Sequence, residues 1–416
     1  MTSTTSSKPL SNIIVLDLTR FFSGPHATLM LAGLGADVIK IDDPKTGDPA
    51  AMSPPFAGPN GVSFQRQTEQ DMGIPYLKRA RGKRSVHLDL KSPEGLAVFL
   101  KMVRNADVVI DNFSVGVTRR LGISHEHLCA VNPKIITCSL TGYGSSGSDQ
   151  GLKAYDLMIQ AATGLMSVTG DQDGPPMKTG SSISDAVAGV HAAMGVVSAL
   201  LHRERTGEGQ AVDVSMADCL FSLLFDEPFD CYEDLGISQR QGNRIMRFSP
   251  FNMYDTRDGR VVLGAATASD WRRLLEVMER HDLLTSEGIM NAGWRIEHNA
   301  EIDDIVSQWT QQHTTQAVID ALNARQIPCS PVRTIAQALD WPQLRQRNMI
   351  SHLWNPLSNS FVRPRAPGFP IKFSDMDDGY VSGAPVPGEH TRDVLAELAG
   401  LNEEEITALM ESGVTN

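Results

Sequence analysis

Ile13-Ile14-Val15-Leu16-Asp17-Leu18 and Asp37-Val38-Ile39-Lys40-Ile41 are the two short apolar runs that decide the fold of this chain. Runs of this length, rich in β-branched residues, predict strands buried on both faces, as in a parallel sheet. Between them, Gly24-Pro25 opens a helical pattern that ends near Gly33 or Gly35. A strand, a helix and a strand within about thirty residues predict a right-handed βαβ crossover.

The same alternation continues downstream. Further strands are expected at Ser85–Leu90, Asp107–Ile110 and Lys134–Leu140, and Ser92-Pro93 is typical of a helix start between two of them. The Pro- and Gly-rich region from Pro44 to Ile74 predicts a long loop. Together these patterns predict an α/β fold with a doubly wound, Rossmann-like parallel sheet in a large domain that begins the chain.

The pattern of predicted strands and helices changes after residue 225. A long apolar helix and a strand at Gln210–Met216 still belong to the large domain, residues 1–225. Beyond it, Phe251–Tyr254 and Val261–Leu263 predict a hairpin, and Glu301–Asn323 predicts a helix. We therefore expect a smaller α+β domain over residues 226–328, followed by an extended segment from Pro364 to Phe373 and terminal helices.

Composition limits the possible functions of the 416-residue chain. The formal net charge of −12 disfavours a nucleic-acid partner, because phosphates would be repelled. Five cysteines without CxxC spacing indicate a reducing compartment and argue against a disulfide frame or a zinc site. The N-terminus has no apolar signal core, and the most apolar segment, Ala186–Leu201, is shorter than a membrane span. The sequence predicts a cytoplasmic protein with no membrane segment.

Basic residues gather in the first half of the chain. The main cluster is Lys78-Arg79-Ala80-Arg81-Gly82-Lys83-Arg84, and Lys91, Arg119-Arg120 and Lys153 follow. In an acidic protein such a run favours an anionic ligand such as the phosphates of a nucleotide. A solvated charged loop explains it equally well from the sequence alone.

Known catalytic motifs are weak or missing. Gly142-Tyr143-Gly144-Ser145-Ser146-Gly147 matches G-x-G-x-x-G after a strand, but a loop follows where a dinucleotide site needs a helix. A flexible loop over a site, or a plain turn, is the better interpretation. The GxxxxGK[ST], HExxH and GxSxG patterns do not occur.

Asp185 stands between a Gly- and Pro-containing loop and the long apolar helix. It is interpreted either as the N-cap of that helix or as a nucleophilic carboxylate. Tyr155-Asp156 also precedes an apolar helix, where capping is again the simple explanation.

Motifs spread over nearly the whole chain, in one order, resemble a known family. They are Leu34-Gly35-Ala36-Asp37-Val38-Ile39-Lys40-Ile41, Lys83-Arg84-Ser85-Val86-His87-Leu88-Asp89-Leu90-Lys91, Ala106-Asp107-Val108-Val109-Ile110-Asp111-Asn112-Phe113, Gly142-Tyr143-Gly144, Asp173-Gly174-Pro175-Pro176, Thr206-Gly207-Glu208-Gly209-Gln210, Ile327-Pro328-Cys329-Ser330-Pro331-Val332 and Gly388-Glu389-His390-Thr391. In these the chain resembles the class III CoA-transferases, which include formyl-CoA transferase, carnitine CoA-transferase and α-methylacyl-CoA racemase.

The resemblance implies an activity and a set of site residues. Asp185 matches the nucleophile that forms an aspartyl-CoA thioester, with Tyr155, Gly142 and Gly144 in the catalytic site. Contacts to coenzyme A, a co-substrate rather than a resident cofactor, are implied at Phe21, Phe22, Ser23, Leu88, Lys91, Asn112, Phe113, Arg120, Leu121, Lys153 and Met216. Where some members carry an Arg after the second strand, this chain has Asp42-Asp43, and Lys45 is the alternative cation for that phosphate contact.

The resemblance also implies how the chains are organised. Residues 329–416 are expected to return and complete the large domain, and two ring-like chains to interlock in a homodimer. The partners implied are an acyl-CoA and a small carboxylic acid, with no metal.

Within the family, the sequence favours a transferase. A racemase needs a His-Asp pair where this chain has Tyr155-Asp156, so racemisation of a 2-methylacyl-CoA is the alternative. The tetraglycine loop of formyl-CoA transferase is missing near Gln241, and Arg244 and Arg247 are candidates to bind a second carboxylate of the acceptor. We therefore favour a dicarboxylate such as succinate, with succinyl-CoA as donor. A non-catalytic CoA-binding subunit of a heteromeric transferase remains a further alternative.

Overall fold

The computed structural model describes residues 8–376 and 379–416. The chain forms two compact units. Unit 1 comprises residues up to 165, 179–227 and 342–416, and unit 2 comprises 166–178 and 228–341.

Unit 1 is built on a six-stranded sheet. Its strands are β1 (Ile14–Asp17), β2 (Asp37–Asp42), β6 (Lys83–His87), β7 (Val108–Asp111), β8 (Ile136–Thr141) and β9 (Ala211–Ser215). They lie in the order β6-β2-β1-β7-β8-β9, and every neighbouring pair is parallel. Counted along the sheet this is the 3-2-1-4-5-6 order of dinucleotide-binding folds, which confirms the predicted doubly wound sheet.

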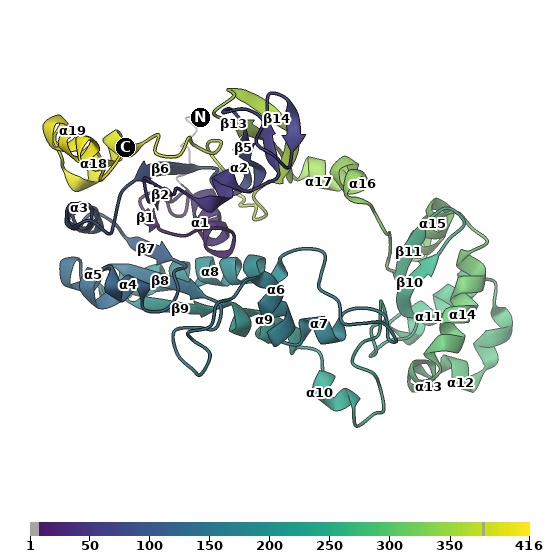
Figure 1. Ribbon diagram of the computed structural model, residues 1–416. Helices are drawn as coiled ribbons and strands as arrows, with labels where there is room; N and C mark the ends of the chain where they lie inside the picture. The colour runs from purple at the N-terminus through teal and green to yellow at the C-terminus, as the bar shows by residue number, and fades with distance from the viewer. Residues whose placement is uncertain (1–7, 377–378) are drawn as a thin grey trace. The chain divides into compact units, whose positions relative to one another are not determined.

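Helices cover both faces of the sheet (Figure 1). One core lies under helices α1 (Ser23–Gly33), α8 (Ile183–Thr206) and α9 (Met216–Leu224). The strands contribute Val15, Val108 and Ile136 to it. Helices α3 (Pro93–Val103), α5 (His125–Val131), α18 (Thr391–Ala399) and α19 (Glu403–Glu411) cover the other core, with Leu16 and Ile39 beneath them. Alternate residues of each strand therefore face opposite cores, as in a parallel sheet buried on both sides.

The crossing of α1 and α8 is close because a glycine lies there. A Cβ at Gly189 would stand only 2.8 Å from the carbonyl oxygen of Ser23. This contact brings the first turn of α1 against the second turn of α8.

Helix α8 is longer than the sequence pattern suggested. Its 24 residues are long and apolar enough to cross a membrane by length and composition. In the structure Ala188, Ala192 and Val196 pack into the core that α8 shares with α1. The expectation that this segment falls short of a membrane span was wrong, and its expected burial inside protein is confirmed only for the face that packs on the core, because Val190, Met194 and Leu201 are exposed.

Residues 44–74 are more structured than the predicted loop. They contain β3 (Phe56–Gly58), β4 (Gly61–Ser63) and β5 (Met72–Gly73), which form a small antiparallel sheet, and they lead into α2 (Ile74–Arg79). Ala57 and Met72 pack with Leu353 and Val362 of a distant hairpin, β13 (Ile350–Asn355) and β14 (Ser360–Pro367). The strands here are too short, at two or three residues for β3 and β5, to leave a periodic signal.

Unit 2 is an α+β unit. Its antiparallel sheet contains β10 (Phe251–Asp255), β11 (Arg260–Gly264) and β12 (Cys329–Pro331), which confirms the predicted hairpin. The single helix expected over 301–323 is two helices, α14 (Asn299–Thr310) and α15 (Thr315–Ala324). The break comes at Thr314, whose hydroxyl accepts from the Ala317 amide and caps the second helix.

The remaining elements are short. They are η1 (Pro49–Met52), α4 (Val117–Arg120), α6 (Asp156–Ala162), α7 (Leu165–Val168), α10 (Phe229–Tyr232), α11 (Ala268–Val277), η2 (His281–Thr285), α12 (Glu287–Met290), α13 (Ala292–Glu297), α16 (Ile335–Asp340) and α17 (Pro342–Gln346).

Candidate active site

A cavity of about 320 Å³ lies at the carboxyl edge of the unit 1 sheet. Its walls come from the segments that follow β1 and β7, which are neighbours in the sheet although the chain winds away from them in opposite directions. Ligands of open α/β sheets bind at this switch point, because the two connecting segments separate there and leave a crevice. The lining residues are Phe21, Phe22, Ser23, Asn112, Phe113, Ser114, Val115, Leu140, Thr141, Gly142, Gln150, Gly151, Leu152, Lys153, Ala154, Tyr155, Asp185 and Met216.

Asp185 reaches this cavity from the first turn of α8. It is the third residue of the helix, and the N-cap position belongs to Ser182, whose side chain makes no capping hydrogen bond. The interpretation of Asp185 as the cap residue was therefore wrong by three positions. Its carboxylate is free of that role and faces the cavity.

The cap of α8 is supplied by Asp156, from the first position of α6. One Asp156 oxygen accepts from the Ser184 amide at 2.9 Å and from the Ser184 hydroxyl at 2.6 Å. The other accepts from the side-chain amide of Gln160 at 2.6 Å. A carboxylate from another helix thus satisfies the free N–H groups that an N-cap side chain would normally satisfy.

Burial and the neighbouring Asp156 carboxylate raise the pKa of Asp185 to about 6. The Arg79 guanidinium and hydrogen bonds from Ser23 act in the opposite direction. Both effects follow from ordinary electrostatics, since a like charge and lost hydration disfavour the ionised form. Asp185 is still mostly ionised at neutral pH, and it is a stronger base than an ordinary carboxylate.

Aromatic side chains stand at the mouth of the cavity. The ring of Tyr155 is 63% exposed and meets Phe21 edge to face, with 6.3 Å between ring centroids. Phe21 and Tyr155 both line the cavity, so a ligand that enters it passes between apolar surfaces.

The glycine loop after β8 contributes one of its two predicted residues to the cavity wall. Gly142 lines the cavity, and a Cβ there would stand 2.3 Å from Cβ of Ala154. Gly144 lies outside the lining, with a φ of +84° that glycine adopts without strain. Asp213 holds the next turn, accepting from the Ser145 amide at 3.0 Å and hydroxyl at 2.6 Å.

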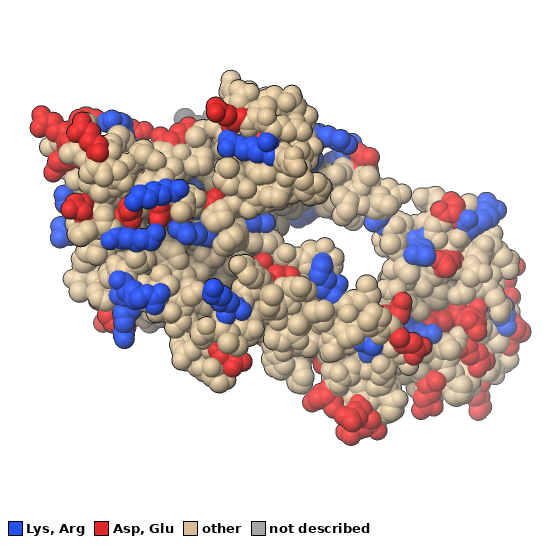
Figure 2. Space-filling model, in the orientation of Figure 1, with Lys and Arg blue, Asp and Glu red and all other residues tan. Residues whose placement is uncertain are grey.

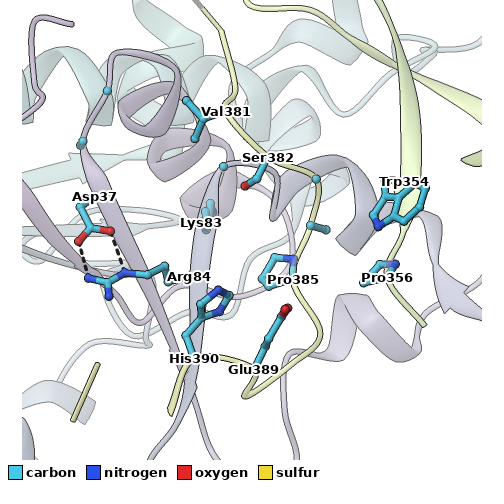
Figure 3. A pocket seen from close by; sticks show the side chains of 15 residues that line it. Asp37, Lys83, Arg84, Trp354, Pro356, Val381, Ser382, Pro385, Glu389 and His390 are labelled. Carbon is cyan, nitrogen blue, oxygen red and sulfur yellow. Dashed lines mark hydrogen bonds and ion pairs between the residues drawn. The ribbon is translucent and has the colours of Figure 1, made fainter. Parts of the chain in front are cut away.

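A second cavity of about 460 Å³ lies at the opposite, amino edge of the sheet (Figure 3). Its two cations are engaged: Arg84 bonds to Asp37 at 3.1 Å and to Glu397, and the Lys83 side chain is fully buried against Asp17. Because ligands of such sheets bind at the carboxyl edge, the Asp185 cavity is the better candidate.

Comparison with known proteins places the chain in a family. The family model described as CoA-transferase family III matches residues 10–391. The chain belongs to this family. Among its family III relatives, the succinyl-CoA:mesaconate CoA-transferase of Haloarcula hispanica is 34% identical over 392 residues, 93% of this chain and 96% of the relative. The succinate–glutarate CoA-transferase of Agrobacterium fabrum is 33% identical, over 94% of this chain and 96% of the relative.

A solved structure agrees with the family assignment. The crystal structure of a CaiB/BaiF family protein from Brucella suis aligns with a TM-score of 0.79 and 29% identity, over 94% of this chain and 100% of that one. The protein is therefore a family III CoA-transferase with the fold predicted from its sequence.

Most of the predicted CoA contacts of this family III CoA-transferase gather at the Asp185 cavity. Phe21, Phe22, Ser23, Asn112, Phe113, Lys153 and Met216 line it, and Leu88, Lys91, Arg120 and Leu121 do not. Arg120 is exposed on α4, and Lys and Arg side chains gather over α4, β7 and β8 in Figure 2.

Asn112 is partly occupied by the protein itself. Its side chain accepts from the Arg20 amide at 2.9 Å and donates to the Arg20 carbonyl at 2.8 Å. These two bonds tie the segment after β7 to the segment after β1, across the switch point.

Three other predicted contacts have protein partners as well. The Leu88 side chain is 1% exposed in the core under α3. Lys91 is 71% exposed but pairs with Asp43 at 2.7 Å, and Lys45, 76% exposed, lies 3.7 Å from Asp89. Asp43 therefore neutralises a cation that was predicted to meet CoA.

The basic cluster of residues 78–84 is not a solvated loop, because it covers the end of α2 and the start of β6 and most of its side chains have partners inside the fold. Lys83 donates to Asp17 at 3.0 Å and to Thr28 at 2.7 Å inside the core. Arg81 donates to the Pro367 carbonyl at 2.9 Å and stacks over Tyr380. Arg79, Arg81, Lys83 and Arg84 each have a partner within the fold, and the sequence alone does not reveal these partners.

Arg244, in unit 2, also has an internal partner. Arg244 donates to the Asp303 carboxylate at 2.8 Å, and the same carboxylate accepts hydrogen bonds from the side chains of Asn252 and Tyr254. Its predicted role in binding an acceptor carboxylate gains no support from this geometry.

Two residues around Asp185 were not predicted, Asp156 in its capping role and Arg79. Asp156 follows Tyr155 in the sequence, which placed Asp156 near the site. Its hydrogen bond to the Ser184 amide of α8 depends on tertiary packing, which the sequence does not reveal. Arg79 lay within the basic cluster, where nothing distinguished it from its neighbours.

Proposed function

We propose that this enzyme moves CoA from succinyl-CoA to a second small carboxylic acid through a covalent intermediate on Asp185. The observation that carries the proposal is the Asp185 carboxylate in the wall of the switch-point cavity, surrounded by seven of the residues expected to contact CoA. The activities after which two relatives are named, succinyl-CoA:mesaconate and succinate–glutarate transfer, support succinyl-CoA or succinate as one partner and a dicarboxylate as the other.

The proposed chemistry has four balanced steps. The Asp185 carboxylate attacks the thioester carbonyl, the C–S bond breaks, and CoA leaves as a thiolate, so that a mixed anhydride of Asp185 and succinate remains. The thiolate attacks the Asp185 carbonyl and releases succinate, leaving an aspartyl-CoA thioester. The acceptor carboxylate attacks that thioester, its C–S bond breaks, and a second mixed anhydride and the CoA thiolate form. The thiolate attacks the acceptor carbonyl of this anhydride, which gives the new acyl-CoA and frees the Asp185 carboxylate. No proton is transferred, so no general base is required.

Local donors suit this sequence of steps. The Ser23 hydroxyl and amide hydrogen-bond to the Asp185 carboxylate. Since the Ser184 amide already donates to Asp156, Ser23 is the group that stabilises negative charge at this centre. Gly142, Gly144 and Tyr155 belong to segments that shield the intermediates from water in this scheme.

Trapping the intermediate tests the proposal. The enzyme is incubated with succinyl-CoA and then with hydroxylamine, and its peptides are analysed by mass spectrometry. We expect a hydroxamate on Asp185 that depends on succinyl-CoA. Failure to trap it at any acceptor concentration would reject the covalent scheme, and exchange of deuterium at the α-carbon of a 2-methylacyl-CoA would support racemisation instead.

We also propose that the enzyme is a cytoplasmic homodimer. Supporting this, α8 exposes an apolar stripe at Val190, Met194, Val197 and Leu201, positions that recur on one face of a helix. Because α8 also carries Asp185, this exposed apolar stripe lies on the helix of the active site. A second copy of the chain could bury it.

Met194→Glu is expected to shift the enzyme from dimer toward monomer. The Met194 side chain is 60% exposed in the single chain, and a charge there would have to be buried in the dimer. Light scattering after size-exclusion chromatography measures the mass. His202→Gln, at an exposed position of the same helix away from this stripe, is the control and should leave the mass unchanged. Equal masses for all three proteins would contradict the proposed interface.

A further inference from the structure

The segment between β1 and α1 is held in an unfavourable conformation. Phe21 has a φ of +67°, although it is neither glycine nor asparagine. This left-handed conformation is strained for a bulky residue, because its Cβ comes too close to the following carbonyl oxygen. Its ring is nonetheless placed against Tyr155 at the cavity mouth. Other groups must therefore hold the segment in place.

Arg79 is one of the groups that hold it. From the last turn of α2, its guanidinium donates to the Phe21 carbonyl and lies 4.1 Å from the centroid of the Phe22 ring. A hydrogen bond and a cation–π contact thus fix two successive residues from one side. The adjoining Ser23 lines the cavity together with Asp185 and lowers the pKa of its carboxyl group.

The charged groups around Asp185 act in opposite senses. Asp156, from α6, raises the pKa of Asp185, whereas the positive charge of Arg79, from α2, lowers it. His26, from α1, has its pKa lowered to about 4 by burial and by Arg79 and Lys83, so it is neutral in the working range. Arg79 is therefore the counter-charge that offsets Asp156.

We propose that Arg79 is a positioning residue that clamps Phe21 and Phe22, holds Ser23 against the Asp185 carboxylate and supplies its counter-charge. The inference rests on the proposed role of Asp185 as nucleophile. Arg79 does not line the cavity, so it acts through the segment that does. A lysine would keep the charge but lose the planar group that bonds and stacks at once.

Three variants test this proposal: Arg79→Met, Arg79→Lys and the control Arg81→Met. Arg81 also stacks on an aromatic ring, Tyr380, at 4.3 Å, but it is not among the groups that affect Asp185. The profile of kcat/KM against pH between 5 and 9 is measured for each. In parallel, the Asp185 carboxyl carbon is titrated by NMR in protein labelled with ¹³C-aspartate, with Asp185→Asn used to assign the signal.

For Arg79→Met we expect kcat/KM to fall on the order of 100-fold at pH 7, and the acid limb of the profile to move up by about one pH unit. Arg79→Lys should keep the limb near its original pH while kcat stays reduced. Arg81→Met should leave the limb in place.

The proposal would be overturned if Arg79→Met kept the acid limb of the kcat/KM profile at the wild-type pH and a kcat within twofold of wild type. A fully active Arg79→Lys would also overturn it. The NMR titration follows Asp185 whether or not it is the nucleophile. An Arg79 effect on that titration without a trapped hydroxamate would reject the covalent scheme alone, and a hydroxamate without an Arg79 effect would reject the clamp alone.

Discussion

Asp185→Asn is expected to lower kcat by a factor on the order of 10⁴ or more and, at the same time, to stabilise the fold. The amide cannot attack a thioester, and in this scheme no other group forms the covalent intermediate. Binding of CoA esters should change little, because the substitution conserves shape at the cavity wall. Single-turnover kinetics with succinyl-CoA and calorimetric binding of CoA separate the two effects.

The gain in stability follows from the raised pKa of Asp185. Since its pKa is about 6 in the folded protein against an ordinary value of 3.8, the folded state binds the extra proton between these values. The wild type therefore loses stability as pH rises from about 4 to about 6, and the full penalty remains above that range. We expect Asp185→Asn to raise the free energy of unfolding by about 1–3 kcal/mol at pH 7 and to match the wild type near pH 4.

Asp149→Asn is the matched control for this measurement. Asp149 is an exposed carboxylate after the glycine loop, so its replacement should leave stability and activity close to wild type. Denaturant unfolding at pH 4 and pH 7 gives the comparison. A destabilised Asp185→Asn at pH 7 would show that the carboxylate supports the fold, contrary to the electrostatics described for the cavity.

Lys83→Met is expected to destabilise the protein by about 3–5 kcal/mol. The Lys83 side chain is fully buried, as is that of Asp17, with 3.0 Å between Nζ and Oδ2. Removing the cation leaves the Asp17 carboxylate buried beside one remaining lysine, Lys40, which is itself paired with Asp42 and Asp48. Urea unfolding measures the loss.

Two further variants identify the cause of that loss. Arg84→Met removes the neighbouring cation, whose partners Asp37 and Glu397 are partly exposed, and should cost no more than about 1 kcal/mol. Asp17→Asn combined with Lys83→Met should cost less than the sum of the two single changes, because neither charge is then left alone. Additive losses would mean that packing, rather than the ion pair, accounts for the effect.

The sheet was predictable from the sequence because its strands are buried on both faces. Runs such as Val15-Leu16 and Val38-Ile39 face opposite cores at alternate positions, so they contain few polar residues to break the signal. The small sheet formed by β3, β4 and β5 was not predictable, because its short strands depend on a hairpin about 300 residues away.

The motifs identified which residues lie at the site more accurately than they identified what those residues do. It led to Asp185 and to seven residues of the cavity wall, yet Leu88 is core and Lys91 pairs with Asp43. Asp156 of α6 caps α8 by accepting from the Ser184 amide. The two residues are 28 positions apart in the sequence, and no local rule predicts such a contact. The break at Thr314, by contrast, carried a local capping signal that the hydrophobic period of the longer segment obscured.

The late return of the chain to the first strands has a consequence for synthesis. The backbone amide of Asp89 bonds to the Val414 carbonyl at 2.8 Å, and Val394 and Leu395 complete the core beneath β6. One face of β6 therefore stays uncovered while roughly the next 300 residues are translated, which at about 5–20 residues per second takes at least tens of seconds. During that interval the nascent sheet exposes apolar surface of the kind that chaperones bind, and we expect ribosome-bound intermediates of this enzyme to be their clients.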